Sequence, residues 1–376
     1  MNAFDCNDWR PERYRRFAVI GGGAWGTALA ATTARAGAET TLFARRDDVV
    51  EDVNIRRRNS AYLGDAALPA NLRASADLGA TVRDAEAVLL VVPSSAIRET
   101  ARQMALVTPS TVPVVICAKG IEPDTGKLMS EIVLDEMPNQ PIAALSGPTF
   151  ADEVADELPT SVTIASDVDT LAGDRLEDSV AAKLAVSISS GAFRAYVSDD
   201  LVGVEIAGAM KNVIAIACGI AEGAGFRSNM RAALIARGLS EMTLLATSLG
   251  GRADTVAGLS GAGDLCLTCS SRQSRNLRFG VELGEGARRD ETFGGKSVVV
   301  EGVRNAVSVT DLARSKGLQL PICEAVRAIV HEEAEIVATL GDLWARPLQA
   351  EPRLIDVALK HPDPEQAREK IGELIG

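Results

Sequence analysis

Histidine is almost absent from this chain: its 376 residues include only two, His331 and His361, both near the end. Imidazole is the usual general base near neutral pH and the commonest metal ligand. A histidine-based mechanism and a histidine-rich metal site are therefore both disfavoured, and we expect any proton transfer to depend on another side chain.

The chain also lacks an excess of positive charge, because its formal net charge is -12. This acidity argues against nucleic acid as the main partner, although it leaves room for a small anion in a local basic pocket. No run of eighteen apolar residues occurs, and the most apolar stretch is interrupted by Glu205 and Lys211. We therefore expect a core helix there and no membrane span. Residues 1–16 lack the apolar run of a signal peptide, and we expect a poorly ordered extension.

The six cysteines are scattered and form no dense framework. We interpret them as reduced thiols of a cytoplasmic protein. Cys266 and Cys269 have the spacing of a redox or zinc pair, but no second pair accompanies them. A structural role is favoured for these two, and we expect no metal site.

The length of 376 residues favours two domains. Short apolar segments alternate with helical patterns up to residue 198, which predicts an α/β domain whose mostly parallel sheet is covered on both faces. The expected strands are residues 17–20, 40–44, 87–92, 112–117, 142–145, 161–165 and 185–188. From residue 199 helical periodicity dominates, with examples at 230–249, 299–316 and 322–340, while 284–296 has the composition of an exposed loop. We therefore expect an extension at 1–16, a dinucleotide-binding domain at 17–198 and an all-α substrate-binding domain at 199–376.

Three glycines, Gly21, Gly23 and Gly26, lie between the first expected strand and a helix. That context is what the Rossmann dinucleotide fingerprint requires. The glycines permit a tight turn and a close backbone approach, and the helix N-terminus offers N–H groups to a pyrophosphate.

The second strand is followed by Arg45 and Arg46, where NAD-selective sites usually carry an acidic residue. Two arginines suit the additional 2′-phosphate of NADPH, so NADPH is favoured and NADH remains possible. The alternative is a solvated charged loop, since Asp47 and Asp48 follow directly. Trp25, within the fingerprint, either flanks the cofactor or packs in the core.

Lys211 lies in an apolar segment that we expect to form a buried helix. Residues at four-residue steps share one side of a helix, and here they are small apart from the lysine: Gly203, Ala207, Lys211, Ala215 and Gly219. The ammonium would stand on a strip that other groups can approach closely. A desolvated lysine is a candidate proton donor or base, and the alternative is a lysine that extends along its stem to solvent.

Other candidate site residues follow expected strands or open helices. Lys119 and Gly147 come at the carboxyl ends of two strands, where open α/β sheets bind ligands. Residues 258–264 are rich in glycine and end at Asp264. Residues 274–276, a serine, an arginine and an asparagine, suit a phosphate cradle at a helix start, or simply a helix cap with a solvated arginine.

At these segments the chain resembles the bacterial-type NAD(P)-dependent glycerol-3-phosphate dehydrogenase family. The similarity extends in order from about residue 17 to 330 and includes segments 21–28, 118–122, 145–151, 203–215, 233–239, 261–269, 273–276 and 299–305. Ala24 stands where the family often has serine, and residues 59–64 lack the family's proline after Tyr62 and Leu63.

The resemblance implies a Rossmann-like domain, a helical domain that could support a homodimer, and reduction of dihydroxyacetone phosphate to sn-glycerol 3-phosphate for phospholipid synthesis. It implies catalytic roles for Lys211, Asp264 and Lys119. The implied cofactor contacts are Gly21, Gly23, Ala24, Trp25, Gly26, Arg45, Arg46, Lys119, Ala151, Arg275, Val299 and Glu301. The implied substrate contacts are Lys119, Gly147, Thr149, Lys211, Asp264, Ser274, Arg275 and Asn276. Two alternatives stay open: a related reductase of a hydroxy acid or ketoacid, and a catalytically silent dinucleotide sensor.

Overall fold

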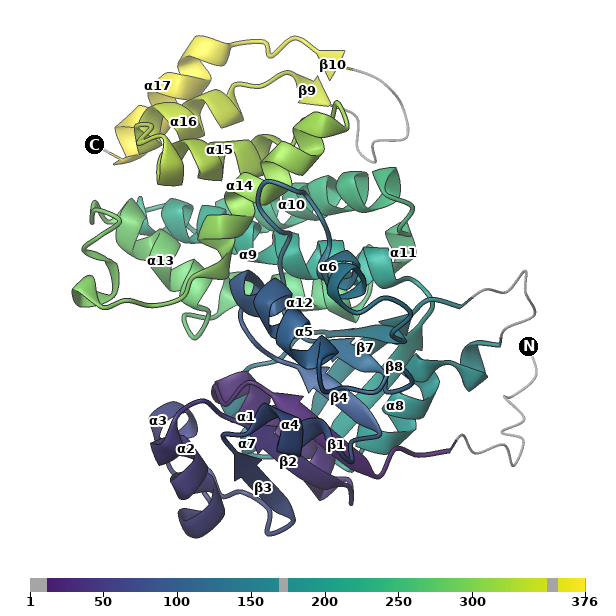
Figure 1. Cartoon of the computed structure of the whole chain (residues 1–376). Helices are drawn as coiled ribbons and strands as arrows, with labels where there is room; N and C mark the ends of the chain where they lie inside the picture. Colours follow the sequence, from purple (N-terminus) through teal and green to yellow (C-terminus); the bar gives the residue numbers. More distant parts are fainter. Residues whose placement is uncertain (1–11, 169–174, 350–357, 376) are drawn as a thin grey trace. The chain divides into compact units, whose positions relative to one another are not determined.

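The computed structural model describes residues 12–168, 175–349 and 358–375 (Figure 1). Most of the expected N-terminal extension, residues 1–11, lies outside the described residues. The described chain forms two compact units. The first runs to Gly208, apart from 123–126, and takes in 249–264; the second comprises 123–126, 209–248 and the chain from Leu265 onward.

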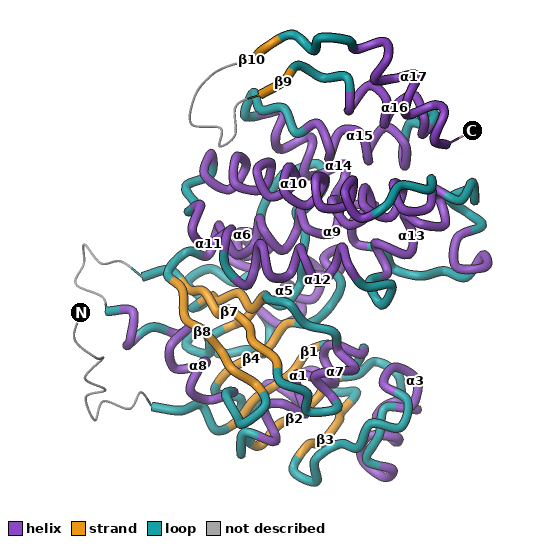
Figure 2. Tube along the Cα trace, turned by 180° about the vertical axis from the view of Figure 1, so that it is seen from behind, coloured by secondary structure: helices purple, strands orange, loops and turns teal. Residues whose placement is uncertain are grey.

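The first unit is built on an eight-stranded sheet with the order β3-β2-β1-β4-β5-β6-β7-β8 (Figure 2). Its strands are β1 (Arg16–Ile20), β2 (Glu39–Phe43), β3 (Leu72–Ser75), β4 (Ala87–Leu90), β5 (Val114–Ile116), β6 (Ile142–Ser146), β7 (Thr160–Ser166) and β8 (Phe193–Ser198). All neighbours pair in parallel except β6 and β7, which are antiparallel. This confirms the expected mostly parallel, Rossmann-like sheet.

Both faces of the sheet are buried, because alternate residues of a strand point to opposite sides. On β1, Phe17 and Val19 belong to one hydrophobic cluster, while Ala18 and Ile20 belong to another. The first cluster includes residues of α1 (Ala24–Arg35) and α8 (Val180–Ile188), and the second includes residues of α5 (Ile97–Ala105) and α6 (Met129–Glu136). The near-continuous apolar strands of the sequence therefore have helices on each side.

Short helices complete this unit: α2 (Asp47–Glu51), α3 (Ser60–Leu63), α4 (Leu78–Val82), α7 (Ala151–Ala155) and α11 (Ala253–Ala257). The long helix α9 (Leu201–Gly223) begins in the first unit and continues into the second.

The second unit is mainly helical, as the sequence predicts. Besides the C-terminal part of α9 it contains α10 (Ser228–Ser248), α12 (Asp264–Ser270) from its second residue, α13 (Arg275–Gly284), α14 (Glu301–Ser315), α15 (Pro321–His331), α16 (Ile336–Trp344) and α17 (Pro364–Ile375). A small antiparallel pair, β9 (Leu348–Gln349) and β10 (Ala358–Leu359), lies before α17.

Helices α9 and α13 approach each other backbone to backbone. A Cβ added to Gly219 would lie 2.2 Å from the carbonyl oxygen of Leu277, and one added to Gly280 would lie 2.3 Å from that of Ile216. The small-residue strip predicted along α9 is therefore not open at this end. At its other end, a Cβ on Gly203 would lie 2.1 Å from the carboxylate of Asp200.

Two strand predictions need correction. Residues 185–188, expected to form a strand, belong to α8, and the strand comes later as β8. The apolar run suits either structure, but Ser179 accepts a hydrogen bond from the Ala182 N–H and so starts a helix. The edge strand β3 was not predicted, because its four residues present an exposed side chain at Arg73 and no continuous apolar run.

The compact units also divide the chain differently from the predicted boundary at residue 198. The first turns of α9 pack on the sheet, where Leu201 and Val204 join Ala144 and Ala165 in one cluster. The Asp200 carboxylate accepts hydrogen bonds from the Gly203 and Arg252 backbone N–H groups, which ties residues 249–264 to the same unit. The predicted exposed loop at 284–296 is likewise only partly exposed, since Thr292 and Phe293 are buried.

Among the described residues, one helix has the length and composition that a membrane span needs, and it is α9. Its most apolar window is 94% buried inside the structure, which is the behaviour of a core helix.

Candidate functional site

The glycine turn joins β1 to α1 in the first unit. Gly21 has φ +131°, and a Cβ there would lie 2.4 Å from the Val91 carbonyl oxygen; a Cβ on Gly26 would lie 1.8 Å from the Gly21 carbonyl oxygen. These two glycines are required by close backbone contacts. Gly23 differs, because no atom lies within 4 Å of its Cβ position, and it is the N-cap of α1 without a side-chain cap. Open space at a helix N-terminus fits a dinucleotide pyrophosphate.

Three other predicted cofactor residues lie around this turn. Ala24 is the first residue of α1, and Trp25 follows it and packs against the core cluster on that face of the sheet. Ala151 opens α7 and packs against the same cluster. All three residues therefore lie in the first unit, as the glycines do, and Trp25 packs against the core.

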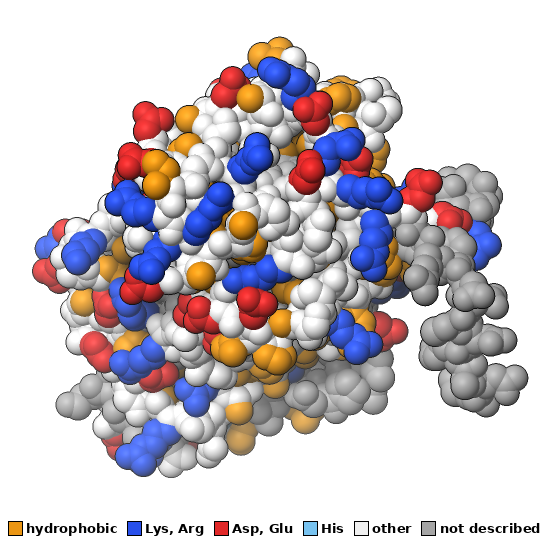
Figure 3. Space-filling view, turned by 90° about the horizontal axis from the view of Figure 1, so that it is seen from below, with side chains coloured by type: hydrophobic (Ala, Val, Ile, Leu, Met, Phe, Trp, Pro, Cys, Tyr) orange, Lys and Arg blue, Asp and Glu red, His pale blue; other side chains and the backbone are white. Residues whose placement is uncertain are grey.

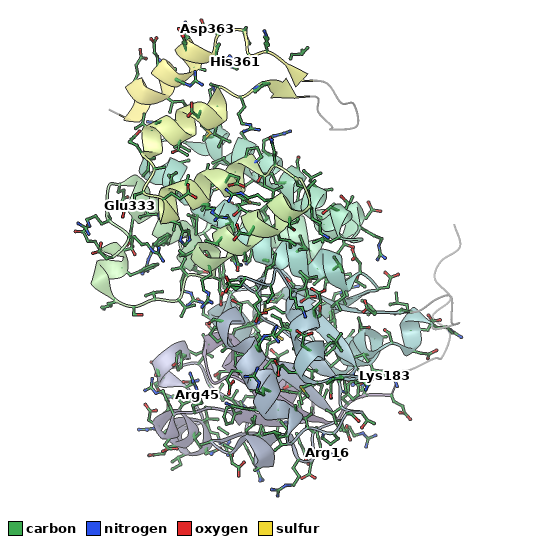
Figure 4. All side chains as sticks on the ribbon, turned by 45° about the horizontal axis from the view of Figure 1, so that its top comes forward. Arg16, Arg45, Lys183, Glu333, His361 and Asp363 are labelled. Atoms are coloured by element: carbon green, nitrogen blue, oxygen red, sulfur yellow. The ribbon has the colours of Figure 1, made fainter. Side chains whose placement is uncertain are left out.

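Arg45 and Arg46 follow β2, as predicted, and both are exposed; Figure 4 shows Arg45 at the surface. Arg46 is engaged by Asp48 through two hydrogen bonds, from Nε to Oδ1 at 2.9 Å and from Nη2 to Oδ2. The hydrogen bond from Arg46 holds the pKa of the Asp48 carboxyl below its usual value. The two arginines are thus not equivalent. Elsewhere, basic and acidic side chains are interspersed over the face that Figure 3 shows.

Lys119 and Asp264 form an ion pair in the first unit, although 145 positions separate them in the sequence. The distance from Lys119 Nζ to Asp264 Oδ2 is 2.6 Å; the lysine side chain is 17% exposed and the aspartate is fully buried. Lys119 Nζ also lies 3.4 Å from the Gly147 carbonyl oxygen, to which Thr149 Oγ1 donates as well. The four predicted substrate residues of this unit therefore form one cluster at the strand ends.

Gly147 and Ser146 shape the floor of this cluster. Gly147 has φ +153°, and a Cβ there would lie 2.9 Å from Val162 Cα, so glycine is required. Ser146 Oγ is buried without a hydrogen-bond partner, and Gly208 of α9 lies beside it and beside the Lys119 side chain. Sequence inspection gave Ser146 no role; its place between an apolar strand and Gly147 is the signal that it ends at the ligand edge of the sheet.

Lys211 lies in the second unit on α9 and is buried, with 7% of its surface exposed. Its Nζ donates a hydrogen bond to Thr268 Oγ1 on α12 at 2.8 Å. The lysine therefore does not extend to bulk solvent, which excludes the alternative interpretation of the sequence. Thr268 was not predicted. It lies four positions after Asp264 on the same short helix, and that spacing is the signal that would have found it.

The start of α13 is bound to α9 and α14. Asn276 Nδ2 donates to Asn212 Oδ1 at 2.8 Å, and Asn276 Oδ1 accepts from the Gly302 N–H at 2.9 Å. Ser274 is the N-cap of α13, since its Oγ accepts from the Leu277 N–H. Arg275, the first residue of α13, is exposed.

The neighbouring arginines are engaged elsewhere. Arg272 pairs with Glu222, and Arg278 stacks over the Phe293 ring at 4.4 Å. Arg275 is therefore the cation of this segment best placed for an anion. Of the remaining predicted cofactor residues, Val299 is 51% exposed and Glu301 opens α14.

The cysteine pair shows no metal-site geometry in the part of the chain that the structure describes. Cys266 is exposed and Cys269 is buried on α12, both as free thiols, and no group of three potential ligands occurs among the described residues. Cys6 lies outside the described residues.

Comparison with known proteins identifies the family. Residues 16–172 match the family model of the NAD-dependent glycerol-3-phosphate dehydrogenase N-terminus, and residues 200–340 match that of the C-terminus. A glycerol-3-phosphate dehydrogenase [NAD(P)+] of Parvibaculum lavamentivorans is 45% identical over 338 residues, which are 90% of this chain and 98% of the relative. The corresponding protein of Rhodospirillum rubrum is 44% identical over 334 residues, covering 89% and 93%.

Solved structures agree. The glycerol-3-phosphate dehydrogenase of Coxiella burnetii has a TM-score of 0.77 and 35% identity over 96% of this chain and all of that one. A D-mandelate dehydrogenase has a TM-score of 0.53 at 15% identity, which shows a shared fold alone. The chain belongs to the NAD-dependent glycerol-3-phosphate dehydrogenase family.

Proposed function

We propose that this protein catalyses the reversible reduction of dihydroxyacetone phosphate to sn-glycerol 3-phosphate with NADPH or NADH. The observation that carries the proposal is Lys211, a buried ammonium donating to a neutral hydroxyl in a chain of this family. The names of the similar dehydrogenases support the substrate and the cofactor.

The nicotinamide supplies the hydride when it is bound. Lys211 donates its proton to the oxygen that becomes an alkoxide, and in the reverse direction the amine accepts the proton of the alcohol. Thr268 orients the lysine because its Oγ1 accepts a hydrogen bond from Lys211 Nζ, so that proton transfer has a defined direction.

Lys119 and Asp264 act as a positioned pair. The buried carboxylate holds the ammonium at the strand ends, where it adds positive charge near an oxygen of the substrate. Arg275 anchors the phosphate from the start of α13, because a guanidinium and a helix N-terminus both favour a phosphate dianion. Gly147, Thr149, Ser274 and Asn276 complete the proposed contacts.

The partners, the location and the oligomeric state are proposed as follows. The acidic net charge supports a function without nucleic acid. The free thiols support a cytoplasmic location. Membership of the family supports a product used in phospholipid synthesis. A homodimer would be tested by light scattering of the purified chain.

The function is tested by following NADPH absorbance with dihydroxyacetone phosphate, and repeating the assay with NADH. Lys211→Ala should lower kcat by about 10²–10⁴-fold while NADPH binding, measured by fluorescence, stays nearly intact. Lys211→Met, which retains the side-chain volume, should behave alike. Lys316→Ala removes an exposed lysine of the same unit and serves as control. Normal turnover by Lys211→Ala would refute the assignment.

A further inference from the structure

The two arginines after β2 differ in what surrounds them. Arg46 makes a bidentate contact with Asp48. Arg45, labelled in Figure 4, is an exposed residue that follows β2. A guanidinium offers a fixed fork of donors, so the face of Arg46 used for a carboxylate is not simultaneously available to a phosphate.

Asp48 is held in place by the backbone as well. Its Oδ1 accepts a hydrogen bond from the Val49 N–H at 3.0 Å. Val49 is buried and lies against Gly22, since a Cβ on that glycine would be 3.6 Å from Val49 Cγ1. The carboxylate is therefore fixed close to the glycine turn.

A hollow of about 520 Å³ lies beside Asp48, and the charged side chains in its lining are Asp48, Asp52, Arg56 and Arg58. Its lining also includes Val49 and Asn59. Asn59 Nδ2 donates to the Gly22 carbonyl oxygen at 3.1 Å and to Thr27 Oγ1 at 2.7 Å, while its Oδ1 is buried without a partner. Asp48 thus places a negative charge on the wall of a hollow whose lining residue Asn59 is hydrogen-bonded to the dinucleotide turn.

We propose that Asp48 is a cofactor-specificity residue: it engages Arg46 and lowers the attraction of this corner for the 2′-phosphate of NADPH, so that NADH remains a competitive cofactor. The inference rests on the proposed dehydrogenase function and deepens it. A 2′-phosphate carries close to two negative charges, whereas the 2′-hydroxyl of NADH carries none. A carboxylate here therefore repels the 2′-phosphate of NADPH and has little effect on the 2′-hydroxyl of NADH.

The expected effect is moderate, because Arg46 and Asp48 are 55% and 61% exposed. Exposed pairs are weakened by solvent and salt. Asp48→Asn, which keeps the shape and removes the charge, should raise the kcat/KM ratio of NADPH over NADH by about three- to tenfold at low salt. The gain should come from a lower KM and Kd for NADPH, with NADH values within about twofold, and it should shrink in 0.5 M salt.

Asp47→Asn is the matched control, because it removes the same charge one position earlier, from an exposed side chain. Its effect on the ratio should be less than half that of Asp48→Asn on a logarithmic scale. In an Arg46→Ala background, Asp48→Asn should likewise give less than half its usual gain. Equal gains in both backgrounds, equal effects of the two asparagine variants, or an unchanged ratio would each overturn the proposal.

The two proposals fail separately. If dihydroxyacetone phosphate is reduced with neither cofactor, the proposed function fails. If reduction proceeds and the NADPH-to-NADH ratio does not respond to Asp48→Asn, only the specificity inference fails. Direct titration of cofactor binding by intrinsic fluorescence gives the Kd ratio independently of turnover.

Discussion

At the residue scale, the site depends on pairings that span long stretches of sequence. The motifs predicted Lys119 and Asp264 as separate candidates. The role of Asp264 in catalysis stays a prediction. The structure pairs Asp264 with Lys119. The sequence indicated both residues because each lies in a recognisable local motif. Their pairing could not be predicted, because a contact between residues 145 positions apart depends on the tertiary fold.

The Lys119–Asp264 pair gives a residue-scale prediction. Asp264→Asn leaves a mostly buried ammonium without its carboxylate, so kcat/KM for dihydroxyacetone phosphate should fall by about 10²-fold or more. Unfolding free energy should fall by about 1–3 kcal/mol, less than for a fully buried pair because Lys119 retains some exposure. Steady-state kinetics and urea unfolding measure the two effects. Asp254→Asn, an exposed carboxylate of the same unit, is the control, and equal behaviour of both variants would contradict the role of the pair.

At the element scale, the sequence predicted most strands and helices because apolar runs and glycine stops are local signals. It failed at residues 185–188, where a short apolar run suits either a helix or a strand, and at β3, whose edge position removes the continuous apolar pattern. The sequence also predicted that the small-residue strip of α9 is accessible to other groups along its length. The strip's C-terminal end is instead where α13 packs, which no local pattern shows.

The α9–α13 contact gives an element-scale prediction. Gly219→Ala would place a methyl group 2.2 Å from the Leu277 carbonyl oxygen, so the helices must separate, and unfolding free energy should fall by about 2–3 kcal/mol. Gly341→Ala is the matched control, because its Cβ position on α16 meets ordinary contacts of 3.6 Å or more with Arg368. That variant should be neutral or gain about 0.5–1 kcal/mol from helix propensity. Thermal and urea unfolding would compare them, and equal losses would argue against close helix contact.

At the scale of the whole molecule, the sequence predicted the order of a sheet domain and a helical domain, and the compact units retain that order. The compact units depart from the predicted boundary because Asp200, through tertiary contacts, holds the first turns of α9 and residues 249–264 in the first unit. Stability at this scale also depends on two buried carboxyls, Glu205 and Glu241. Burial raises the pKa of each to about 7, although each accepts hydrogen bonds, Glu205 from Ser130 and Glu241 from two backbone N–H groups.

These carboxyls predict a pH dependence of stability. A pKa raised on folding means that the native state binds the proton more tightly than the unfolded state, so each glutamate costs increasing stability as pH rises from about 4.5 to about 7. Glu205→Gln cannot ionise. Relative to wild type, its unfolding free energy should therefore improve by about 1–3 kcal/mol between pH 5 and pH 8.

Urea unfolding at several pH values measures this difference between variant and wild type. Glu241→Gln tests the same physics at an independent site and should show the same direction. A difference that is constant across this pH range would show that the Glu205 proton is not bound more tightly in the native state.

The return of residues 249–264 to the first unit has a consequence for how the protein is made. The aspartate that neutralises Lys119 is the last residue of that returning segment, and it is translated only after the whole of α9 and α10. When β8 has just emerged from the ribosome, the sheet is therefore complete but Lys119 still lacks the buried carboxylate of Asp264. Biogenesis of the nucleotide-binding half must wait for part of the helical half, and the two halves cannot be exchanged between relatives as contiguous cassettes cut at the end of the sheet.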